Sequence, residues 1–370
     1  MKVLILSCNT GGGHNACAQA LVQKLEQMGH ESATKDALGY VSDRVSRIVS
    51  NWHVRFYRHF PKLYGKGYQY AEEHPATFDE DSAACRLLRS GCARMRQEIE
   101  SGGYGAVICT HLFPAMMLSY IQHALPLAIR TCFLATDYTA SPSCSCVSLD
   151  ACVIPDASLT EEFVRAGIRQ ETIVPLGIPV RAMFEGGSDP AQAKRAFQIN
   201  PAHRHLVIMS GSMGCGPISE VVSCLAKKMP VSCELSVVCS SNKKLYRKLR
   251  MRYGHKKNVH VLGFVKNIAK LLDSADVFIT KPGGISTTEA VVKGIPMVLI
   301  NAVGGCETHN LEFFVSRGAA CTADTPKELA WQSLQLLQNE PRCASMRRAM
   351  QELGYAGAAA RICKLVCEEA

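Results

Sequence analysis

The sequence has no uninterrupted apolar run of the roughly 18 residues that a membrane-spanning helix needs, so we expect any membrane contact to be peripheral. It also lacks a leader-like start, because the apolar stretch after Lys2 is short and runs directly into glycines. No internal repeat and no low-complexity segment occurs in its 370 residues. These absences favour a cytoplasmic globular protein, and this length suits two domains of roughly 150 residues each.

Disulfide and zinc scaffolds are disfavoured as well, although the chain has 18 cysteines. The cysteines are scattered through strand-like and helix-like segments of a long chain, which is typical of reduced cytosolic thiols. Cys144, Cys146 and Cys152 lie close together in the sequence, but their spacing is not that of a zinc site. We therefore expect structural thiols and no bound metal.

Two successive series of apolar runs predict two α/β domains. Residues 3–7 form a buried-strand pattern, followed by Gly11-Gly12-Gly13-His14 and an amphipathic segment over residues 15–28. A second series opens in the same way at residues 206–210. We predict an N-terminal domain over residues 1–180, a linker over 181–200 and a C-terminal domain over 201–370, with a last helix able to cross back. Further strands are predicted at residues 106–110, 131–136, 151–154, 235–239, 259–262, 277–280 and 297–300.

Two doubly wound, Rossmann-like domains are expected to face each other across a cleft between the carboxyl ends of their strands. Ligands of such domains bind at these strand ends, where helix N-termini direct backbone N–H groups at anions. The pattern therefore favours a ligand that carries phosphate.

Two glycine-rich turns in the second half are candidates for binding this phosphate. Residues 211–214 connect a predicted strand to a predicted helix, although such a connection is about as often only a tight turn. Residues 281–289 lie at a similar position, where Ser286 and Thr287 add hydroxyls at the start of a helix. The carboxylate of Glu289 can accept hydrogen bonds from two ribose hydroxyls, or it can simply be an acid in the first turn of a helix.

In their order along the chain, these motifs resemble the family of monogalactosyl- and processive diglucosyl-diacylglycerol synthases, with the peptidoglycan N-acetylglucosaminyltransferase as a more distant relative. The resemblance covers nearly the whole chain and includes residues 11–14, 136–138, 177–180 and 263–265. It implies the GT-B fold and a UDP-sugar donor. The donor contacts that it implies are Gly211, Ser212, Gly214, Phe264, Val265, Gly283, Gly284, Ser286, Thr287, Glu289, Gly305, Glu307 and Asn310.

The loop that recognises the sugar departs from the family pattern, which is Pro-Gly-Gln-Glu with an asparagine three residues later. Gly305, Glu307 and Asn310 match this pattern, whereas Gly304 and Cys306 replace the proline and the glutamine. A thiol cannot replace an amide that both donates and accepts hydrogen bonds. The departure therefore leaves the donor sugar open, but not the nucleotide.

His14 is the candidate catalytic base. It lies at the start of a predicted helix, and imidazole, with a pKa near 6.5, can take a proton from an acceptor hydroxyl. A polar residue that completes a turn is the alternative interpretation. Asp137, at the end of a predicted strand, is the rival base or an orienting partner, and a turn-initiating aspartate is the alternative there.

The net charge of +9 favours an acidic partner, which can be a nucleotide, a phospholipid surface or a nucleic acid. Residues 44–70 contain six Lys/Arg, seven aromatic residues and no acid, a composition typical of a segment at a membrane interface. Packing into the core and binding of single-stranded nucleic acid are the alternatives, but no RNA-binding motif accompanies the segment. A second basic run over residues 243–257 is adequately explained by a solvated helix face, and a contribution to membrane binding is the alternative, which the pattern does not require. The predicted membrane and acceptor contacts are Trp52, Arg55, Phe56, Arg58, Phe60, Lys62 and Lys66.

Together these features predict an inverting hexosyltransferase that moves a sugar from a UDP-sugar to a membrane lipid such as diacylglycerol, at the inner face of the cell membrane. His14 deprotonates the acceptor hydroxyl, and helix N-termini stabilise the charge that grows on the departing diphosphate, so no tightly bound cofactor or metal is expected. Two alternatives are a UDP-sugar epimerase of the same fold and a non-catalytic protein that binds UDP-sugars at the membrane surface.

Overall fold

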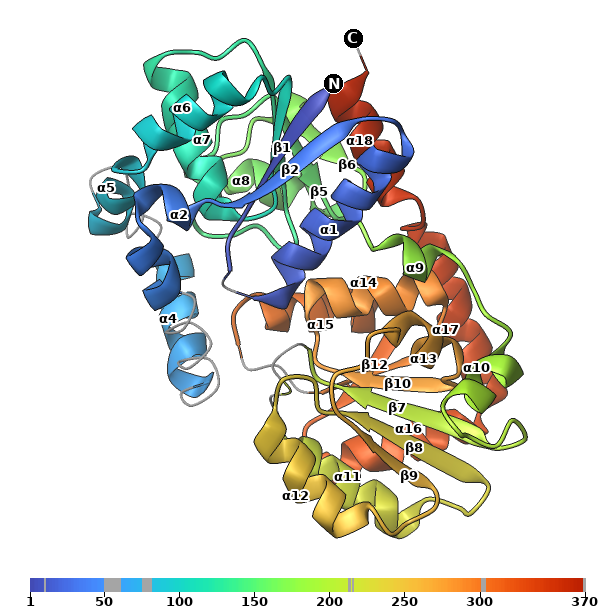
Figure 1. Cartoon of the computed structure of the whole chain (residues 1–370). Helices are drawn as coiled ribbons and strands as arrows, with labels where there is room; N and C mark the ends of the chain where they lie inside the picture. The colour runs from blue at the N-terminus through green and yellow to red at the C-terminus, as the bar shows by residue number, and fades with distance from the viewer. Residues whose placement is uncertain are drawn as a thin grey trace. The chain divides into compact units, whose positions relative to one another are not determined.

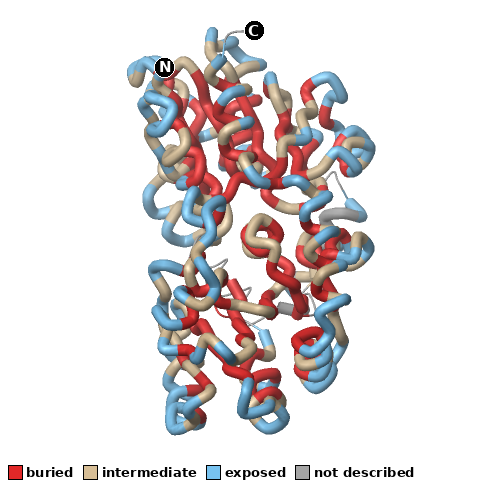
Figure 2. Tube along the Cα trace, turned by 90° about the vertical axis from the view of Figure 1, so that its right-hand side faces the viewer, coloured by how far each residue is buried: buried red, intermediate tan, exposed pale blue. Residues whose placement is uncertain are grey.

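The computed structural model describes residues 1–9, 11–49, 61–74, 82–211, 214, 216–300 and 304–368. The chain forms two compact units. Unit 1 comprises Met1–Ala182, Val303–Cys306 and Gly357–Ala370, and unit 2 comprises Met183–Ala302 and Glu307–Ala356. In each unit the buried backbone follows the strands and the inner sides of the flanking helices, while the outer helices and loops are exposed (Figure 2).

Unit 1 is built on a six-stranded sheet in the order β2-β1-β3-β4-β5-β6, in which all pairs are parallel. Helices flank this sheet, as expected for parallel strands that are buried on both faces (Figure 1). The strands are β1 (Lys2–Ser7), β2 (Glu31–Asp36), β3 (Ala106–Cys109), β4 (Arg130–Leu134), β5 (Ala151–Ile154) and β6 (Ile173–Pro175). The helices are α1 (Gly12–Gln27), α2 (Leu38–Val41), α4 (Pro61–Glu73), α5 (Ala83–Arg89), α6 (Cys92–Gly102), α7 (Leu112–Ala124), α8 (Thr160–Arg165) and α18 (Ala358–Cys367).

Unit 2 repeats this architecture with a second parallel sheet, in the order β12-β11-β10-β7-β8-β9. Its strands are β7 (Arg204–Met209), β8 (Cys233–Val238), β9 (Val259–Leu262), β10 (Val277–Thr280), β11 (Met297–Ile300) and β12 (Ala320–Ala323). Its helices are α10 (Pro190–Ala196), α11 (Ile218–Lys228), α12 (Lys243–Tyr253), α13 (Ile268–Asp273), α14 (Gly284–Lys293), α15 (Cys306–Ser316), α16 (Pro326–Gln338) and α17 (Glu340–Leu353). The predicted α/β class, with two doubly wound sheets, is confirmed.

The segment predicted as a linker is not an extended connection. It contains α9 (Ala182–Glu185) and α10, and the chain passes from one unit to the other between Ala182 and Met183. The Asp189 side chain caps α10 by accepting a hydrogen bond from the Gln192 N–H at 2.8 Å, with a proline at the first position of the helix. The glycines and proline of this stretch therefore end one helix and start the next.

The last helix, α18, belongs to unit 1 and packs against α1 (Figure 1). The Cys363 thiol donates to the Leu21 carbonyl at 3.9 Å, and the Arg130 guanidinium donates to the Leu365 carbonyl at 3.3 Å. Ile362 and Val366 bury the apolar side of the helix.

Three strands were not predicted, namely β2, β6 and β12. The sequence of β2, Glu-Ser-Ala-Thr-Lys-Asp, has no apolar periodicity, because this edge strand is largely exposed. The strand forms through its ladder to β1, which pairs Lys2 with Glu31 and Ser7 with Asp36. β6 and β12 are also edge strands, and both are short.

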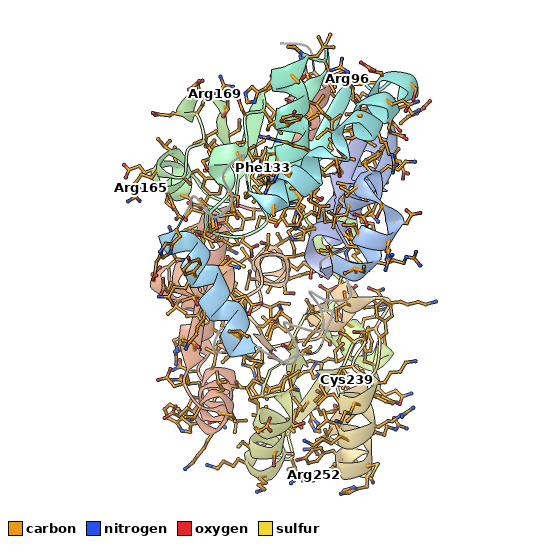
Figure 3. The ribbon with its side chains drawn as sticks, turned by 90° about the vertical axis from the view of Figure 1, so that its left-hand side faces the viewer. Arg96, Phe133, Arg165, Arg169, Cys239 and Arg252 are labelled. Atoms are coloured by element: carbon orange, nitrogen blue, oxygen red, sulfur yellow. The ribbon has the colours of Figure 1, made fainter. Side chains whose placement is uncertain are left out.

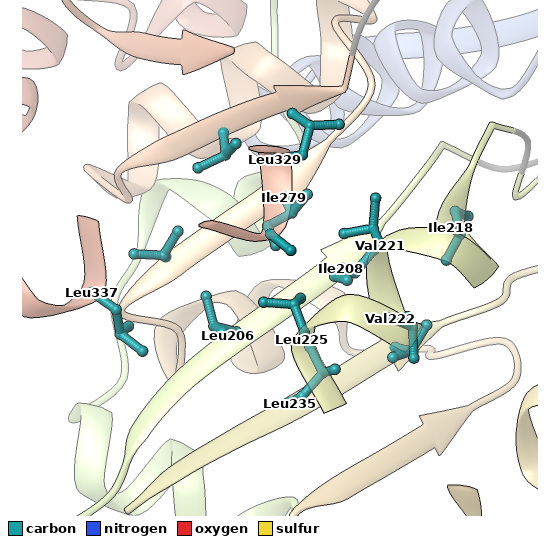
Figure 4. Packing of buried hydrophobic residues seen from close by; sticks show 14 of the residues in the cluster. Leu206, Ile208, Ile218, Val221, Val222, Leu225, Leu235, Ile279, Leu329 and Leu337 are labelled. Carbon is teal, nitrogen blue, oxygen red and sulfur yellow. The ribbon is translucent and has the colours of Figure 1, made fainter. Parts of the chain in front are cut away.

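The core of unit 2 lies where α11 and α16 cover the sheet. Leu206, Ile208 and Leu235 of the strands meet Val221 and Leu225 of α11, and all five side chains are fully buried (Figure 4). No disulfide links the described cysteines, most of which are buried in such clusters. Burial raises the pKa of the Cys132 and Cys144 thiols to about 12, so these two are protonated at neutral pH.

A buried histidine adds a polar element to this sheet. His205 of β7 is fully buried; its Nδ1 lies 3.1 Å from the Ser274 carbonyl and its Nε2 2.9 Å from the Ser236 hydroxyl. A carbonyl only accepts hydrogen bonds, so Nδ1 carries the proton. Burial lowers the pKa of His205 to about 4, and the ring is neutral in the folded protein.

We predict that His205 makes the stability of unit 2 depend on pH. As the pH falls below about 6.5, the unfolded chain takes up a proton at this residue while the folded chain does not, so stability falls by about 2–3 kcal/mol by pH 4.5. Urea unfolding at pH 7 and pH 4.5 should show a smaller loss for His205→Gln than for the unsubstituted chain. His255→Gln, at an exposed position in the same unit, serves as the control, and equal losses in all three proteins would contradict the prediction.

Candidate active site

The two predicted catalytic residues of unit 1, His14 and Asp137, and the residues around them follow three neighbouring strands. β1, β3 and β4 lie side by side in the sheet. The glycine turn after β1 leads to His14 in the first turn of α1, Thr110 follows β3, and Thr136 and Asp137 follow β4. Because the strands are parallel, these residues meet at the carboxyl edge of the sheet.

His14 is held by its neighbours in a defined orientation. Its Nδ1 lies 2.8 Å from the Thr110 carbonyl oxygen and 3.1 Å from the Thr136 hydroxyl oxygen. Since the carbonyl can only accept, Nδ1 donates, and the lone pair of the neutral ring is on Nε2. The contact with Thr110 therefore fixes the tautomer in which Nε2 can accept a proton.

The surroundings of His14 also favour its neutral form. Burial lowers the pKa of His14, and the charge of Asp137 and the Thr110 carbonyl oppose this effect only in part. A general base must be unprotonated before the reaction, so this direction suits the predicted role.

A second histidine, His111, lies against His14 and was not predicted. The two ring centroids are 4.5 Å apart in an edge-to-face arrangement. His111 precedes α7, and its Nδ1 accepts a hydrogen bond from the Phe113 N–H at 3.1 Å. The available sequence signal was its place directly after the predicted strand over residues 106–110.

In unit 2 the predicted glycine turn follows β7. Gly211 has a φ of +61°, and a Cβ there would lie 2.8 Å from Cε of Lys281. A side chain at this position would therefore be strained and would also collide with Lys281. Ser212 lies outside the described residues.

Two residues that follow β8 hold this turn, and neither was predicted. The Ser240 hydroxyl donates to the Gly211 carbonyl at 3.1 Å, and the Asn242 amide donates to the Gly214 carbonyl at 2.9 Å. Asn242 also caps α12, because its side-chain oxygen accepts from the Leu245 N–H at 2.9 Å. The start of α12 is therefore tied to the glycine turn.

The second predicted turn leads from β10 into α14. Gly283 precedes the helix without a side-chain cap, so the first N–H groups of the helix remain available for an anion. Ser286 is half-buried, whereas Thr287 is fully buried and its hydroxyl donates to the carbonyls of Gly283 and Gly284 at 3.0 Å. The Thr287 hydroxyl thus stabilises the first turn of its own helix, and its predicted contact with a diphosphate stays a prediction. Glu289 is buried in the next turn.

Lys281 and Glu307 form an ion pair beside these turns. The Lys281 Nζ lies 2.5 Å from Oε1 of Glu307, which is in the first turn of α15. Asn310, fully buried, donates from its amide to the Pro282 carbonyl at 2.9 Å. Two of the three residues that match the family's sugar loop therefore contact the turn over residues 281–284. Lys281 itself was not predicted as a site residue, although the motif that contains it was.

The remaining predicted positions are placed as follows. Phe264 is 80% exposed and Val265 half-buried in the loop after β9, and Gly305 directly precedes α15. Lys66 is exposed on α4. Trp52, Arg55, Phe56, Arg58 and Phe60, and the side chain of Lys62, lie outside the described residues.

Among the described residues, no cluster of three His, Cys, Asp or Glu side chains could hold a metal ion. The sequence does contain one Asp-x-Asp triplet, Asp79-Glu80-Asp81, which lies outside the described ranges. Within the part of the chain that the structure describes, no helix is long and apolar enough to cross a membrane.

Solved structures show the same fold at low sequence identity. MurG of Acinetobacter baumannii has a TM-score of 0.65 at 15% identity, with 99% of both chains covered. Anabaena HepE in complex with UDP has a TM-score of 0.60 at 14% identity, again with 99% of both chains covered. The UDP-GlcNAc 2-epimerase of Neisseria meningitidis has a TM-score of 0.66 at 11% identity over all of both chains. These structural similarities show that the chain has the GT-B fold, and they show nothing beyond the fold.

Comparison with protein families defines the class of the protein. Residues 218–353 match the profile described as glycosyl transferases group 1. With the fold, this shows that the protein is a GT-B glycosyltransferase, as predicted. More particularly, residues 14–180 match the profile of monogalactosyldiacylglycerol (MGDG) synthase, and the resemblance to this family that the motifs predicted is confirmed.

Similarity to curated proteins extends over nearly the whole chain. The processive diacylglycerol beta-glucosyltransferase of Staphylococcus carnosus is 24% identical over 367 residues, which cover 98% of this chain and 91% of that protein. The protein of the same name from Bacillus licheniformis is 27% identical over 362 residues, which cover 95% and 91%.

We predict that Lys281→Met lowers the stability of unit 2 by about 3 kcal/mol, because it removes the cation beside a buried carboxylate. The double variant Lys281→Met/Glu307→Gln should recover most of this loss, since it also removes the buried charge. Urea unfolding of the two single variants and the double variant measures the coupling between the residues. Lys266→Met, at an exposed lysine, is the control and should change stability by less than about 0.5 kcal/mol. Additive effects of the two substitutions would show that the pair does not couple.

Proposed function

We propose that the protein transfers a hexose from a UDP-sugar to the hydroxyl of a membrane lipid such as diacylglycerol, with inversion at the anomeric carbon. The observation that carries the catalytic part is the orientation of His14, whose Nδ1 bonds the Thr110 carbonyl so that Nε2 can accept a proton. The acceptor rests on the similarity over nearly the full chain to proteins named processive diacylglycerol beta-glucosyltransferase.

The glycine turns of unit 2 support a nucleotide diphosphate as the leaving group. Gly211 lacks a side chain, α14 begins with free N–H groups, and Ser286 is in its first turn. The Lys281 ammonium lies 3.8 Å from the position that a Cβ of Gly211 would occupy, so a cation adjoins the turn. These donors stabilise the negative charge that develops on a departing diphosphate. The related fold of HepE was solved in complex with UDP, which is consistent with this ligand.

The proposed reaction uses one proton transfer and one substitution. Nε2 of His14 takes the proton of the acceptor hydroxyl while the acceptor oxygen bonds to the anomeric carbon. The bond from that carbon to the diphosphate oxygen breaks, and UDP leaves with the electron pair. Because UDP-glucose is an α-glucoside, a β-glucoside product requires inversion, which agrees with the name that the curated relatives carry.

Association with the membrane follows from the acceptor, since diacylglycerol resides in a bilayer. We propose that the protein binds peripherally at the cytoplasmic face. The basic and aromatic segment over residues 44–70 was predicted to make this contact. Its residues 50–60 lie outside the described residues, so the contact stays a prediction.

A UDP-sugar epimerase is the second candidate, because such epimerases share the fold at a similar TM-score. Mass spectrometry of a set of UDP-sugars incubated with diacylglycerol in anionic vesicles distinguishes the two. A glycolipid and free UDP would support transfer, whereas an isomerised UDP-sugar without glycolipid would support the epimerase. If neither product formed, the protein would be one that binds UDP-sugars without catalysing a reaction.

We predict that Glu289→Ala weakens UDP binding by about 1–3 kcal/mol, because charge-assisted hydrogen bonds to the ribose are lost. Calorimetric titration with UDP measures this loss. Glu289→Gln keeps the shape of the side chain and should lose a similar part of the affinity. Glu220→Ala is the matched control, since Glu220 is also a helical glutamate of unit 2 but is exposed on α11. Unchanged UDP affinity in both Glu289 variants would remove this residue from the site.

We predict that His14→Ala lowers turnover by roughly 10²–10⁴-fold and leaves UDP affinity near that of the unsubstituted enzyme. Because burial lowers the pKa of His14, the ring stays neutral down to pH values below 6.5, so the acidic limb of the turnover profile should lie below pH 6.5. Turnover measured from pH 5 to 8 tests this expectation. Near-normal turnover in His14→Ala, together with loss of activity in Asp137→Asn, would assign the base to Asp137.

A further inference from the structure

Helix α12 of unit 2 divides sharply into an apolar and a basic side. Leu249 and Tyr253 are buried, and Leu245 and Tyr246 pack against the core. The basic side chains are all exposed, and Figure 3 shows side chains projecting from this helix into solvent, with Arg252 labelled near its end. The basic residues of the helix are Lys243, Lys244, Arg247, Lys248, Arg250 and Arg252.

The helix itself contains no acidic residue that could balance this charge. Residues 243–257 contain eight Lys/Arg and neither Asp nor Glu. Buried lysines of unit 2 are paired, as Lys194 is with Asp276 at 3.1 Å and Lys293 with Asp273 at 2.7 Å. Within the described ranges, by contrast, none of the six basic side chains of α12 takes part in an ion pair. Like charges one turn apart repel, so the bare helix is destabilised in a way that an external anion would relieve.

An exposed apolar side chain lies within the basic side. Met251 is 85% exposed and follows Arg247 by four residues and Lys248 by three, so these cations flank it on the helix surface. A methionine that lies in water among cations is not stabilised by apolar contacts with the protein itself. At the boundary between lipid headgroups and acyl chains, both kinds of side chain find partners.

The end of α11 extends the basic surface. The Lys256 Nζ donates to the Ala226 carbonyl at 2.8 Å, which holds the segment after α12 against the last turn of α11. This turn carries Lys227 and Lys228, and both are exposed. The surface formed by α12 and the end of α11 is here called the α12 surface.

We propose that the α12 surface is a docking site for a bilayer that contains anionic lipids. Single-stranded nucleic acid is the other polyanion to consider, but it binds through exposed aromatic rings on which bases stack. The aromatic residues of α12 are turned inward, since Tyr253 is buried and Tyr246 half-buried, while the exposed apolar residue is aliphatic. The inference deepens the proposed function, because a lipid acceptor requires the enzyme to reach a bilayer.

Co-sedimentation with vesicles tests the α12 surface in the full-length protein. The vesicles contain either phosphatidylcholine alone or equal parts phosphatidylcholine and phosphatidylglycerol. Each cation near an anionic surface changes binding about fivefold, so Lys244→Gln/Arg247→Gln/Lys248→Gln should lower the affinity for anionic vesicles on the order of 100-fold at low salt. Added salt should also weaken the binding of the unsubstituted protein to anionic vesicles. Met251→Glu should also weaken it, although it leaves every cation in place.

A matched variant separates the local surface from the net charge of the protein. Arg195→Gln/Lys327→Gln/Arg348→Gln removes the same three charges from exposed positions of unit 2 on α10, α16 and α17. This control should bind anionic vesicles nearly as well as the unsubstituted protein. Urea unfolding should show that both triple variants are folded.

The outcomes either support or overturn the docking site. Loss of vesicle binding in the α12 variant but not in the control supports it. Equal affinity of all variants for anionic vesicles overturns it, and so does tight binding of a labelled oligonucleotide that the α12 substitutions abolish while vesicle binding persists. The proposed function is tested separately, by sugar transfer to short-chain diacylglycerol in detergent micelles. If that transfer fails while α12-dependent vesicle binding holds, the proposed function falls and the docking site stands.

Discussion

Parallel pairing of the central strands is the constraint on which the candidate site depends. In parallel strands the carboxyl ends lie at one edge, so loops that are distant in the sequence come together there. β1, β3 and β4 bring Thr110 and Thr136 within hydrogen-bond distance of His14, although these residues span more than a hundred positions. β7 and β10 likewise place the Lys281 side chain directly against Gly211.

Burial decides what the charged and titratable groups of this protein can do. Lys281 is acceptable beside the glycine turns because Glu307 compensates its charge. The cations of α12, by contrast, form no ion pair with any residue that the structure describes and remain exposed to water. Burial lowers the pKa of both His14 and His205. His205 is enclosed between Ser236 and Ser274, while His14 is half-buried at the carboxyl edge of its sheet.

The side chain of Asn242 connects the glycine turn after β7 to the helix that carries the α12 surface. Asn242 caps the helix with its oxygen and binds the Gly214 carbonyl with its nitrogen. An amide has both a donor and an acceptor, so one side chain can serve both contacts. The position of the turn is therefore coupled to the start of the helix that carries the basic side.

The sequence by itself determined the α/β class, nine of the strands and the glycine turns, because continuous apolar runs and glycines are local signals of buried parallel strands and tight turns. It also determined His14 as a candidate, from its place after the first turn. Only the tertiary structure decided that β2 is a strand, that Thr287 bonds its own helix, and that His111, Ser240 and Lys281 adjoin the candidate site. The physical reason is that these features arise from ladders, hydrogen bonds and close contacts between segments far apart in the chain, and no local pattern records which segments will meet.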